Sequence, residues 1–199
     1  MAPRKYEMAG RAKAMAETRT RILDAAKELH ASNGVRVTSW DEIADGAGVA
    51  VATVYRHFPT LDELVPACAR SVFDFIRPPT LEEASSRFAA LSDPSDRLAL
   101  LVKKSVHCYE LGEGWLHAAY RERDFLRSLD NALAIIQGAV DVLVTAAVAR
   151  RLGKTEHALL FTLCDFPFYK LLVDSGLDRR VAERRIIDLV TTVEKESRP

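Results

Sequence analysis

The spacing of apolar residues constrains the fold of this chain more than any other feature of its sequence. Apolar side chains recur every three or four residues along almost the whole length, and no segment sustains the two-residue alternation of a strand. One such apolar face is formed by Ile22, Ala26 and Leu29. It belongs to a helix expected over 18–32, which Gly34 ends. The sequence therefore predicts an all-α protein.

Helix starts are marked by a Ser or Thr that precedes a Glu by three residues, which is the pattern of a capping box. Such starts occur at Ser39, Thr60 and Thr80, and Asp93 before a proline is a further cap. The helix that begins near Thr60 is expected to reach about Ile76. It would link a compact set of short helices to a set of longer ones.

The second half of the chain contains the longer helices. They are expected over 94–111, 116–122, 124–151, 155–174 and 178–197. Gly112 and Gly114 should separate the first two, because glycine is a poor helix former. Pro167 should bend the helix over 155–174.

Composition and charge exclude several classes of protein. The 199 residues include 28 basic and 28 acidic side chains, so any basic surface must be local. Cys68, Cys108 and Cys164 form no CxxC pair, which argues against a disulfide framework or a metal site and favours a reduced, cytoplasmic compartment. The longest apolar stretch, 139–149, is shorter than the roughly 20 residues that span a bilayer. We therefore expect no membrane partner.

Residues 39–58, SWDEIADGAGVAVATVYRHF, carry the pattern that points to a function. A short amphipathic helix is followed by a turn at Gly48 and by a second short helix with Val51, Val54 and Phe58 on one face. Two short helices joined by a glycine-containing turn are typical of a helix-turn-helix. In that motif the second helix enters the DNA major groove.

The opposite face of the second helix has the chemistry of a DNA contact. It would carry Ala50, Ala52, Thr53 and Arg56. Alanine methyl groups can pack on a thymine methyl group, a threonine hydroxyl can bind a base or a phosphate, and an arginine can pair with guanine or phosphate. The tips of the aromatic residues that end the helix suit phosphate oxygens.

The stretches RILDAAKELHASNG and DEIADGAGVAVATVYRHFPTLDEL resemble the DNA-binding domain of the tetracycline-repressor (TetR) family of bacterial regulators. The resemblance implies a three-helix, N-terminal helix-turn-helix domain followed by a larger helical domain that dimerises and binds a ligand. It also implies a homodimer on a palindromic, double-stranded DNA operator, released by an unknown small molecule. The residues it would place on DNA are Ser39, Trp40, Ala50, Val51, Ala52, Thr53, Tyr55, Arg56 and His57.

The chain departs from the family pattern in its charge. Many members have a lysine where this sequence has Val51, and another where it has Leu61. Residues 18–60 contain five basic and five acidic side chains, so this region is neutral. The missing cations could come from a basic N-terminal arm, residues 1–17, which could lie along phosphates or enter the minor groove. The expected domains are therefore this arm, a helix-turn-helix domain over 18–64 and a C-terminal domain over 65–199.

Two further sites are expected in the C-terminal domain. Aromatic and polar residues that could line a ligand pocket are His107, Tyr109, Trp115 and Tyr120. Ordinary core packing explains these residues equally well. Apolar residues that could form the dimer interface are Leu163, Phe166, Ile186, Val190 and Val193. An intramolecular core is the alternative for this second set.

Two other functions are alternatives to that of a regulator. An enzyme with an accessory helix-turn-helix would need a catalytic or cofactor motif, and the sequence contains no P-loop, dinucleotide fingerprint, nucleophile elbow or HExxH. We therefore expect neither catalysis nor a cofactor. A helical interaction protein whose helix-turn-helix no longer binds DNA stays open, because Val51 and Leu61 replace the usual lysines.

Overall fold

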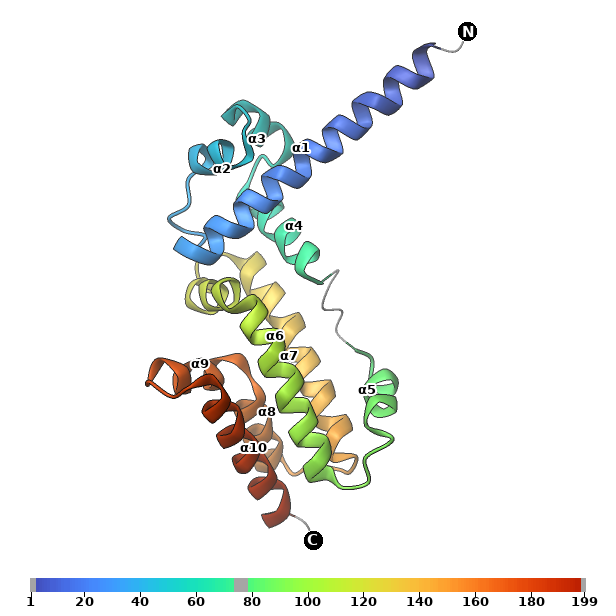
Figure 1. Cartoon of the computed structure of the whole chain (residues 1–199), viewed down its shortest axis with the longest axis vertical. Helices are drawn as coiled ribbons and strands as arrows, with labels where there is room; N and C mark the ends of the chain where they lie inside the picture. Colours follow the sequence, from blue (N-terminus) through green and yellow to red (C-terminus); the bar gives the residue numbers. More distant parts are fainter. Residues whose placement is uncertain (1–2, 74–78, 198–199) are drawn as a thin grey trace. The chain divides into compact units, whose positions relative to one another are not determined.

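The computed structural model describes residues 3–73 and 79–197, and every regular element within them is an α-helix (Figure 1). The helices are α1 (Pro3–Asn33), α2 (Trp40–Ala47), α3 (Val51–His57), α4 (Leu61–Phe73), α5 (Leu81–Phe88), α6 (Pro94–Glu122), α7 (Arg127–Val148), α8 (Lys154–Cys164), α9 (Phe166–Asp174) and α10 (Arg179–Glu196). The predicted all-α class is confirmed.

The helices form two compact units. Unit 1 consists of residues 1–75 and 114–132, and unit 2 of residues 76–113 and 133–199. Helices α6 and α7 each contribute residues to both units. Helix α4 ends at Phe73, and the predicted continuation to Ile76 lies outside the described residues.

Unit 1 is built on a core shared by the first four helices. Ile22 of α1, Ile43 of α2, Val54 of α3 and Leu64 of α4 are at most 1% exposed and belong to one apolar cluster, together with Phe58. Burying side chains of this size stabilises a fold by roughly 1.5–3 kcal/mol each. This core holds α2 and α3 against α1.

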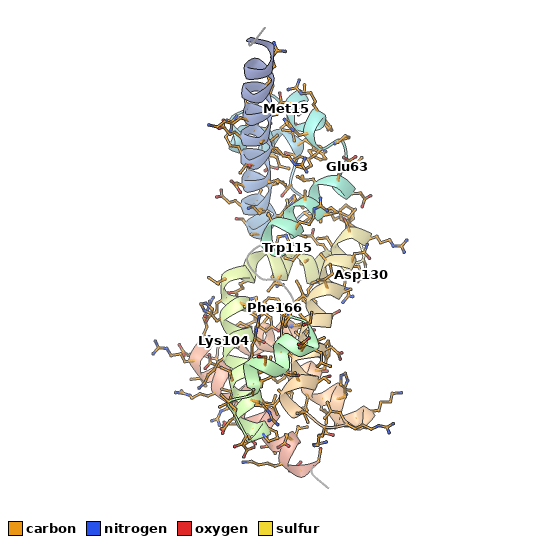
Figure 2. The ribbon with its side chains drawn as sticks, turned by 90° about the vertical axis from the view of Figure 1, so that its right-hand side faces the viewer. Met15, Glu63, Lys104, Trp115, Asp130 and Phe166 are labelled. Atoms are coloured by element: carbon orange, nitrogen blue, oxygen red, sulfur yellow. The ribbon has the colours of Figure 1, made fainter. Side chains whose placement is uncertain are left out.

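Helix α1 is longer than the sequence predicted, because it begins at Pro3 instead of near residue 18. The added segment is rich in alanine, lysine, arginine and glutamate, which are strong helix formers. It lacks the apolar periodicity on which the prediction relied. The residues from Gly10 to Glu17 are all exposed, and Met15 marks this part of the helix in Figure 2.

Helix α6 continues through Gly112 and Gly114, where the sequence predicted a break. A single glycine costs a helix only about 1 kcal/mol relative to alanine, which tertiary packing can offset. At Gly114 the packing requires it: an added Cβ would lie 2.7 Å from the carbonyl oxygen of Ala31 and 3.0 Å from its Cβ. The glycine thus allows α6 to approach the end of α1 closely.

The helix predicted over 155–174 is two helices, α8 and α9, and not one bent helix. Asp165 between them has φ −81° and ψ 154°, which is extended backbone. Its side chain accepts a hydrogen bond from the backbone N–H of Phe166 at 2.9 Å and caps α9. Pro167 therefore lies in the first turn of a new helix, where a missing N–H costs nothing.

Unit 2 has its own core, formed where α6, α8, α9 and α10 meet. The phenolic hydroxyl of Tyr109 donates a 2.7 Å hydrogen bond to the carbonyl oxygen of Cys164. The ring of Tyr109 lies edge-on to Phe166, with 5.5 Å between the ring centroids. Leu160 and Ile186 are fully buried on α8 and α10. Tertiary hydrogen bonding therefore ties α6 to the end of α8.

Helix α7 is long enough and apolar enough to cross a membrane, by length and composition. The same test is passed by core helices of soluble proteins. Leu133, Val140 and Val144 of α7 are buried, but the larger part of its apolar window is not covered within the single chain.

We predict that Gly114→Ala lowers the free energy of unfolding by about 1–3 kcal/mol, because overpacking against a backbone carbonyl forces a shift. Gly138→Ala is the matched control, since Gly138 is also helical and an added Cβ would meet no described atom within 4 Å. There the helix propensity gain of up to about 1 kcal/mol should stabilise the protein. Urea unfolding of both variants tests this. Equal stability changes would show that α6 does not need a glycine at 114.

Candidate nucleic-acid interface

The first short helix of unit 1, α2, is fixed by local hydrogen bonds that the sequence predicted. Ser39 caps α2: its hydroxyl accepts from the backbone N–H of Glu42 at 3.2 Å, and the Glu42 carboxylate accepts from the backbone N–H of Ser39 at 2.7 Å. Gly48 ends α2 with φ 63°, a left-handed conformation that favours glycine. The capping boxes predicted at Ser39 and Thr80 are both confirmed.

Helix α3 turns one face to the core and the other outward. Val54 and Phe58 are buried, and Val51 packs against the same cluster. Ala52 and Arg56 are exposed, as is Ala50 directly before the helix. Thr53 and His57 are half-buried at the edges of the exposed face, and 45% of Tyr55 is exposed. This outer face of α3 is the candidate interface.

Side chains on the outer face contact one another. The ring of Trp40, at the start of α2, lies against Tyr55, with 5.1 Å between the centroids. The guanidinium of Arg56 donates a 3.3 Å hydrogen bond to the hydroxyl of Thr53. Burial, followed by the nearby charges of Arg56 and Arg19, lowers the pKa of His57, which favours its neutral form. Arg56 is therefore the cation of this helix.

Two arginines of α1 have a role that the sequence did not reveal. Arg19 donates to the carbonyl oxygen of His57 at 3.3 Å, and its guanidinium lies 4.1 Å from the ring centroid of Phe58. Arg21 donates to the carbonyl oxygen of Ala47 at 3.0 Å. Carbonyl groups at helix ends need such donors. These two arginines hold the ends of α3 and α2. Each contact joins residues that are 38 or 26 positions apart in the chain, so no local sequence signal predicts it.

A second junction in unit 1 joins the end of α6 to the turn after α1. The carboxylate of Glu122 accepts from the backbone N–H of Arg36 at 2.8 Å and from the guanidinium of Arg121 at 2.8 Å. Arg121 also donates to the carbonyl oxygen of Asn33 at 3.3 Å. Burial opposes ionisation of Glu122, but the hydrogen bonds from Arg121 and Arg36 outweigh it and lower its pKa. Sequence reasoning missed this acidic residue.

The four predicted ligand-binding residues are divided between the two units. Trp115, on α6 (Figure 2), is buried and Tyr120 is half-buried, and both belong to unit 1. His107 is exposed and Tyr109 is buried, and both belong to unit 2. Tyr109 lines a crevice with apolar neighbours such as Leu163, and this crevice is too narrow to admit a water molecule. The structure thus does not bring the four together within one unit.

The predicted dimer residues differ in exposure. Phe166, Ile186 and Val190 are at most 1% exposed in the single chain, and their own unit already covers them. Leu163 and Val193 are half-buried. The large apolar side chains that these C-terminal helices leave exposed are Leu159, Leu171 and Leu189.

The described residues give little support for metal or thiol chemistry. They contain no group of three or more His, Cys, Asp or Glu side chains that could hold a metal ion. Burial raises the pKa of the Cys68 and Cys164 thiols to about 12, and it also raises that of Cys108. The nucleophilic thiolate form is therefore scarce at neutral pH.

Comparison with known proteins places this geometry in a family. Residues 22–68 match the sequence profile of bacterial regulatory proteins of the tetR family. The HTH-type transcriptional repressor KstR2 of Mycobacterium tuberculosis is 34% identical over 58 residues, which is 29% of either chain. The match thus spans less than a third of that repressor's length.

Solved structures extend the likeness to nearly the whole chain. A TetR transcription regulator from Haloarcula marismortui has a TM-score of 0.63 at 14% identity, over 91% of this chain and 98% of that one, which shows the shared fold. The multidrug binding protein EbrR, complexed with imidazole, has a TM-score of 0.55 at 25% identity, over 86% and 88% of the two chains. Residues 22–68 thus match the DNA-binding domain of the tetR family of bacterial regulatory proteins, and the chain as a whole shares the fold of solved TetR regulators.

Proposed function

We propose that the chain is a transcriptional repressor that binds a palindromic DNA operator as a homodimer and leaves it when a small molecule binds. The observation that carries this proposal is the exposed outer face of α3, held by a capped and matched helix-turn-helix. Its proposed DNA contacts are the nine residues predicted from the sequence. As such a repressor, the protein would be cytoplasmic and would need no catalytic group or cofactor.

A homodimer is supported by the exposed apolar side chains of the C-terminal helices. Leu159 of α8 and Leu189 of α10 are 48% and 43% exposed, and these two helices pack against each other. Exposed apolar patches that are contiguous mark protein–protein interfaces. A two-fold dimer would present two copies of α3 to half-sites about 34–36 Å apart or a multiple of that distance. The dimer interface is therefore proposed for the exposed edges of α8 and α10, flanking the buried Ile186 and Val190.

Ligand release is supported by the likeness to a multidrug binding protein and by the crevice beside Tyr109. The residues that line the crevice are mainly apolar, and Ser105 and Tyr169 are among them. A mainly apolar ligand with one polar anchor fits this chemistry. To enter, it would have to move α6 relative to α8 within unit 2.

The function is tested by selecting DNA duplexes from a random pool with the purified full chain and measuring their affinity by fluorescence anisotropy. Arg56→Ala should weaken binding about 5-fold to 150-fold, the range of a lost base or phosphate contact. Arg87→Ala is the matched control, because Arg87 is equally exposed but lies on α5. Failure to enrich any duplex at low salt would favour an interaction protein that does not bind DNA.

A further inference from the structure

The first turn of α3 offers few side-chain groups for hydrogen bonding. Ala52 and Arg56 lie two residues before and after the buried Val54, so a helical rotation of about 200° places them opposite the core. Ala50 and Val51 have no polar side-chain atom either. The first turn of the helix thus presents mainly methyl groups, and Ala52 is the most outward of them.

The hydroxyl group nearest to these methyl groups already has a partner. Thr53 Oγ1 accepts the hydrogen bond from Arg56 at 3.3 Å. In this hydrogen bond one lone pair of the Thr53 hydroxyl accepts from Arg56. The methyl group of Thr53 can still make an apolar contact. The ring of Tyr55 lies against that of Trp40. The Thr53 hydroxyl keeps its proton and a second lone pair for a base or phosphate, whereas Ala50, Val51 and Ala52 offer only shape and apolar contact.

The charge of the surrounding domain strengthens this dependence. Residues 18–60 are neutral, and two of their five basic residues, Arg19 and Arg21, donate to carbonyl oxygens of the domain itself. Attraction to phosphates supplies most of the sequence-independent affinity of DNA-binding proteins. A neutral domain gains less from that source, so contacts with the bases must contribute more of the total.

We propose that this protein recognises its operator through thymine 5-methyl groups in the major groove, with Ala52 as the residue that determines specificity. Alanine and the methyl group of threonine are side chains that pack on a thymine methyl, and cytosine and guanine offer no such group. The proposal rests on the proposed function and names the base that each half-site must contain. Arg56, which is hydrogen-bonded to Thr53, lies one helical turn after Ala52 and borders the proposed apolar contact.

The test uses the DNA, which avoids any effect on folding. In the duplex selected from the random pool, each thymine is replaced in turn by uracil, which lacks only the methyl group. At one or two positions per half-site, uracil should weaken binding about 4-fold for each methyl group, and about 15-fold when both half-sites change. 5-Bromouracil at the same positions should restore the affinity, because its bromine fills the volume of the methyl group.

A protein variant links the effect to Ala52. Ala52→Gly removes the contacting methyl group, so this variant should bind the thymine and uracil duplexes equally. Ala134→Gly is the matched control, since Ala134 is also exposed on a helix, and it should retain the full discrimination. A thermal melt of both variants verifies that they are folded. If Ala52→Gly is unfolded, Ala52→Ser replaces it and should also reduce the discrimination.

The outcomes separate this proposal from the function on which it rests. Enrichment of no duplex overturns the DNA-binding function itself. Tight binding that no uracil substitution weakens keeps the function and overturns the thymine-methyl proposal. A selected half-site read by guanine, with loss of affinity on guanine→7-deazaguanine instead, has the same consequence and assigns the reading to Arg56.

Discussion

Ile186→Asp is expected to unfold the protein, although the sequence pattern alone suggested that it would split a dimer. Ile186 is 1% exposed and lines the crevice of unit 2 with Tyr109 and Leu163. Aspartate there would place a carboxylate in apolar surroundings and also remove a buried side chain. The combined cost of more than about 4 kcal/mol is a large fraction of a typical stability of 5–15 kcal/mol. Circular dichroism at 25 °C tests this prediction, because the unfolded variant should have lost the helical signal.

The neighbouring Leu189→Asp should behave differently, because Leu189 is 43% exposed. We expect it to retain its helical signal and to sediment as a monomer, if α10 contributes to a homodimer. Leu81→Asp is the control, since Leu81 is 51% exposed on α5 and away from α8 and α10 in the sequence. A folded, monomeric Ile186→Asp protein would contradict our assignment of Ile186 to the core.

The helix-turn-helix could be predicted from the sequence because its determinants are local. The capping box of Ser39 and Glu42 starts α2, Gly48 ends it, and Val54 directs α3 to the core. Each signal lies within a few residues of the feature that it specifies. The outward placement of Ala52 and Arg56 follows from the helical repeat alone.

Features that depend on distant contacts could not be predicted. Gly114 was expected to end a helix, but it lies within α6. A glycine is needed there because the carbonyl oxygen of Ala31 lies close by, and Ala31 is far away in the sequence. Arg19 and Arg21 donate to carbonyl oxygens of α3 and α2, which lie 38 and 26 positions further along the chain. Pro167 was expected to bend a helix, but the extended backbone of Asp165 had already ended it.

The C-terminal site residues illustrate a different limit. An apolar stripe on a helix indicates a buried face but does not say what buries it. Ile186 and Val190 are covered by their own chain, whereas Leu189 is not. Aromatic residues near one another in sequence can likewise end in separate units, as Tyr109 and Trp115 do. Periodicity therefore predicted burial correctly but not the partner.

Acid is expected to destabilise this protein through His30. The imidazole is fully buried, and neither ring nitrogen has a hydrogen-bond partner among the described residues. Burial lowers the pKa of His30 from 6.5 to about 4, and the charge of Glu122 opposes the shift without cancelling it. In the unfolded chain the same histidine takes up its proton near pH 6.5. Between pH 6.5 and pH 4 the unfolded state therefore binds more protons than the folded state. The free energy of unfolding must then decrease as the pH is lowered.

The size of this effect follows from the separation of the two pKa values. Linkage gives a loss of about 2 kcal/mol at pH 5 and about 3 kcal/mol at pH 4, relative to pH 7.5. His30→Leu removes the titrating group, so its free energy of unfolding should decline less over this range. At pH 7.5 the variant should be at least as stable as the wild type, because the substitution breaks no hydrogen bond of the imidazole ring.

Urea unfolding of the wild type and His30→Leu at pH 7.5, 6 and 5 measures the difference. Glu122 also has a lowered pKa, so its stabilising contribution is lost in acid, but below its ordinary value of 4.5 and in both proteins alike. His57 also has a lowered pKa but is present in both proteins, so the difference between their curves from pH 7.5 to 5 isolates His30. His117→Leu is the matched control for the substitution itself, because His117 is exposed in the same unit. Parallel curves for the wild type and His30→Leu would mean that His30 is hydrated in solution and keeps an ordinary pKa.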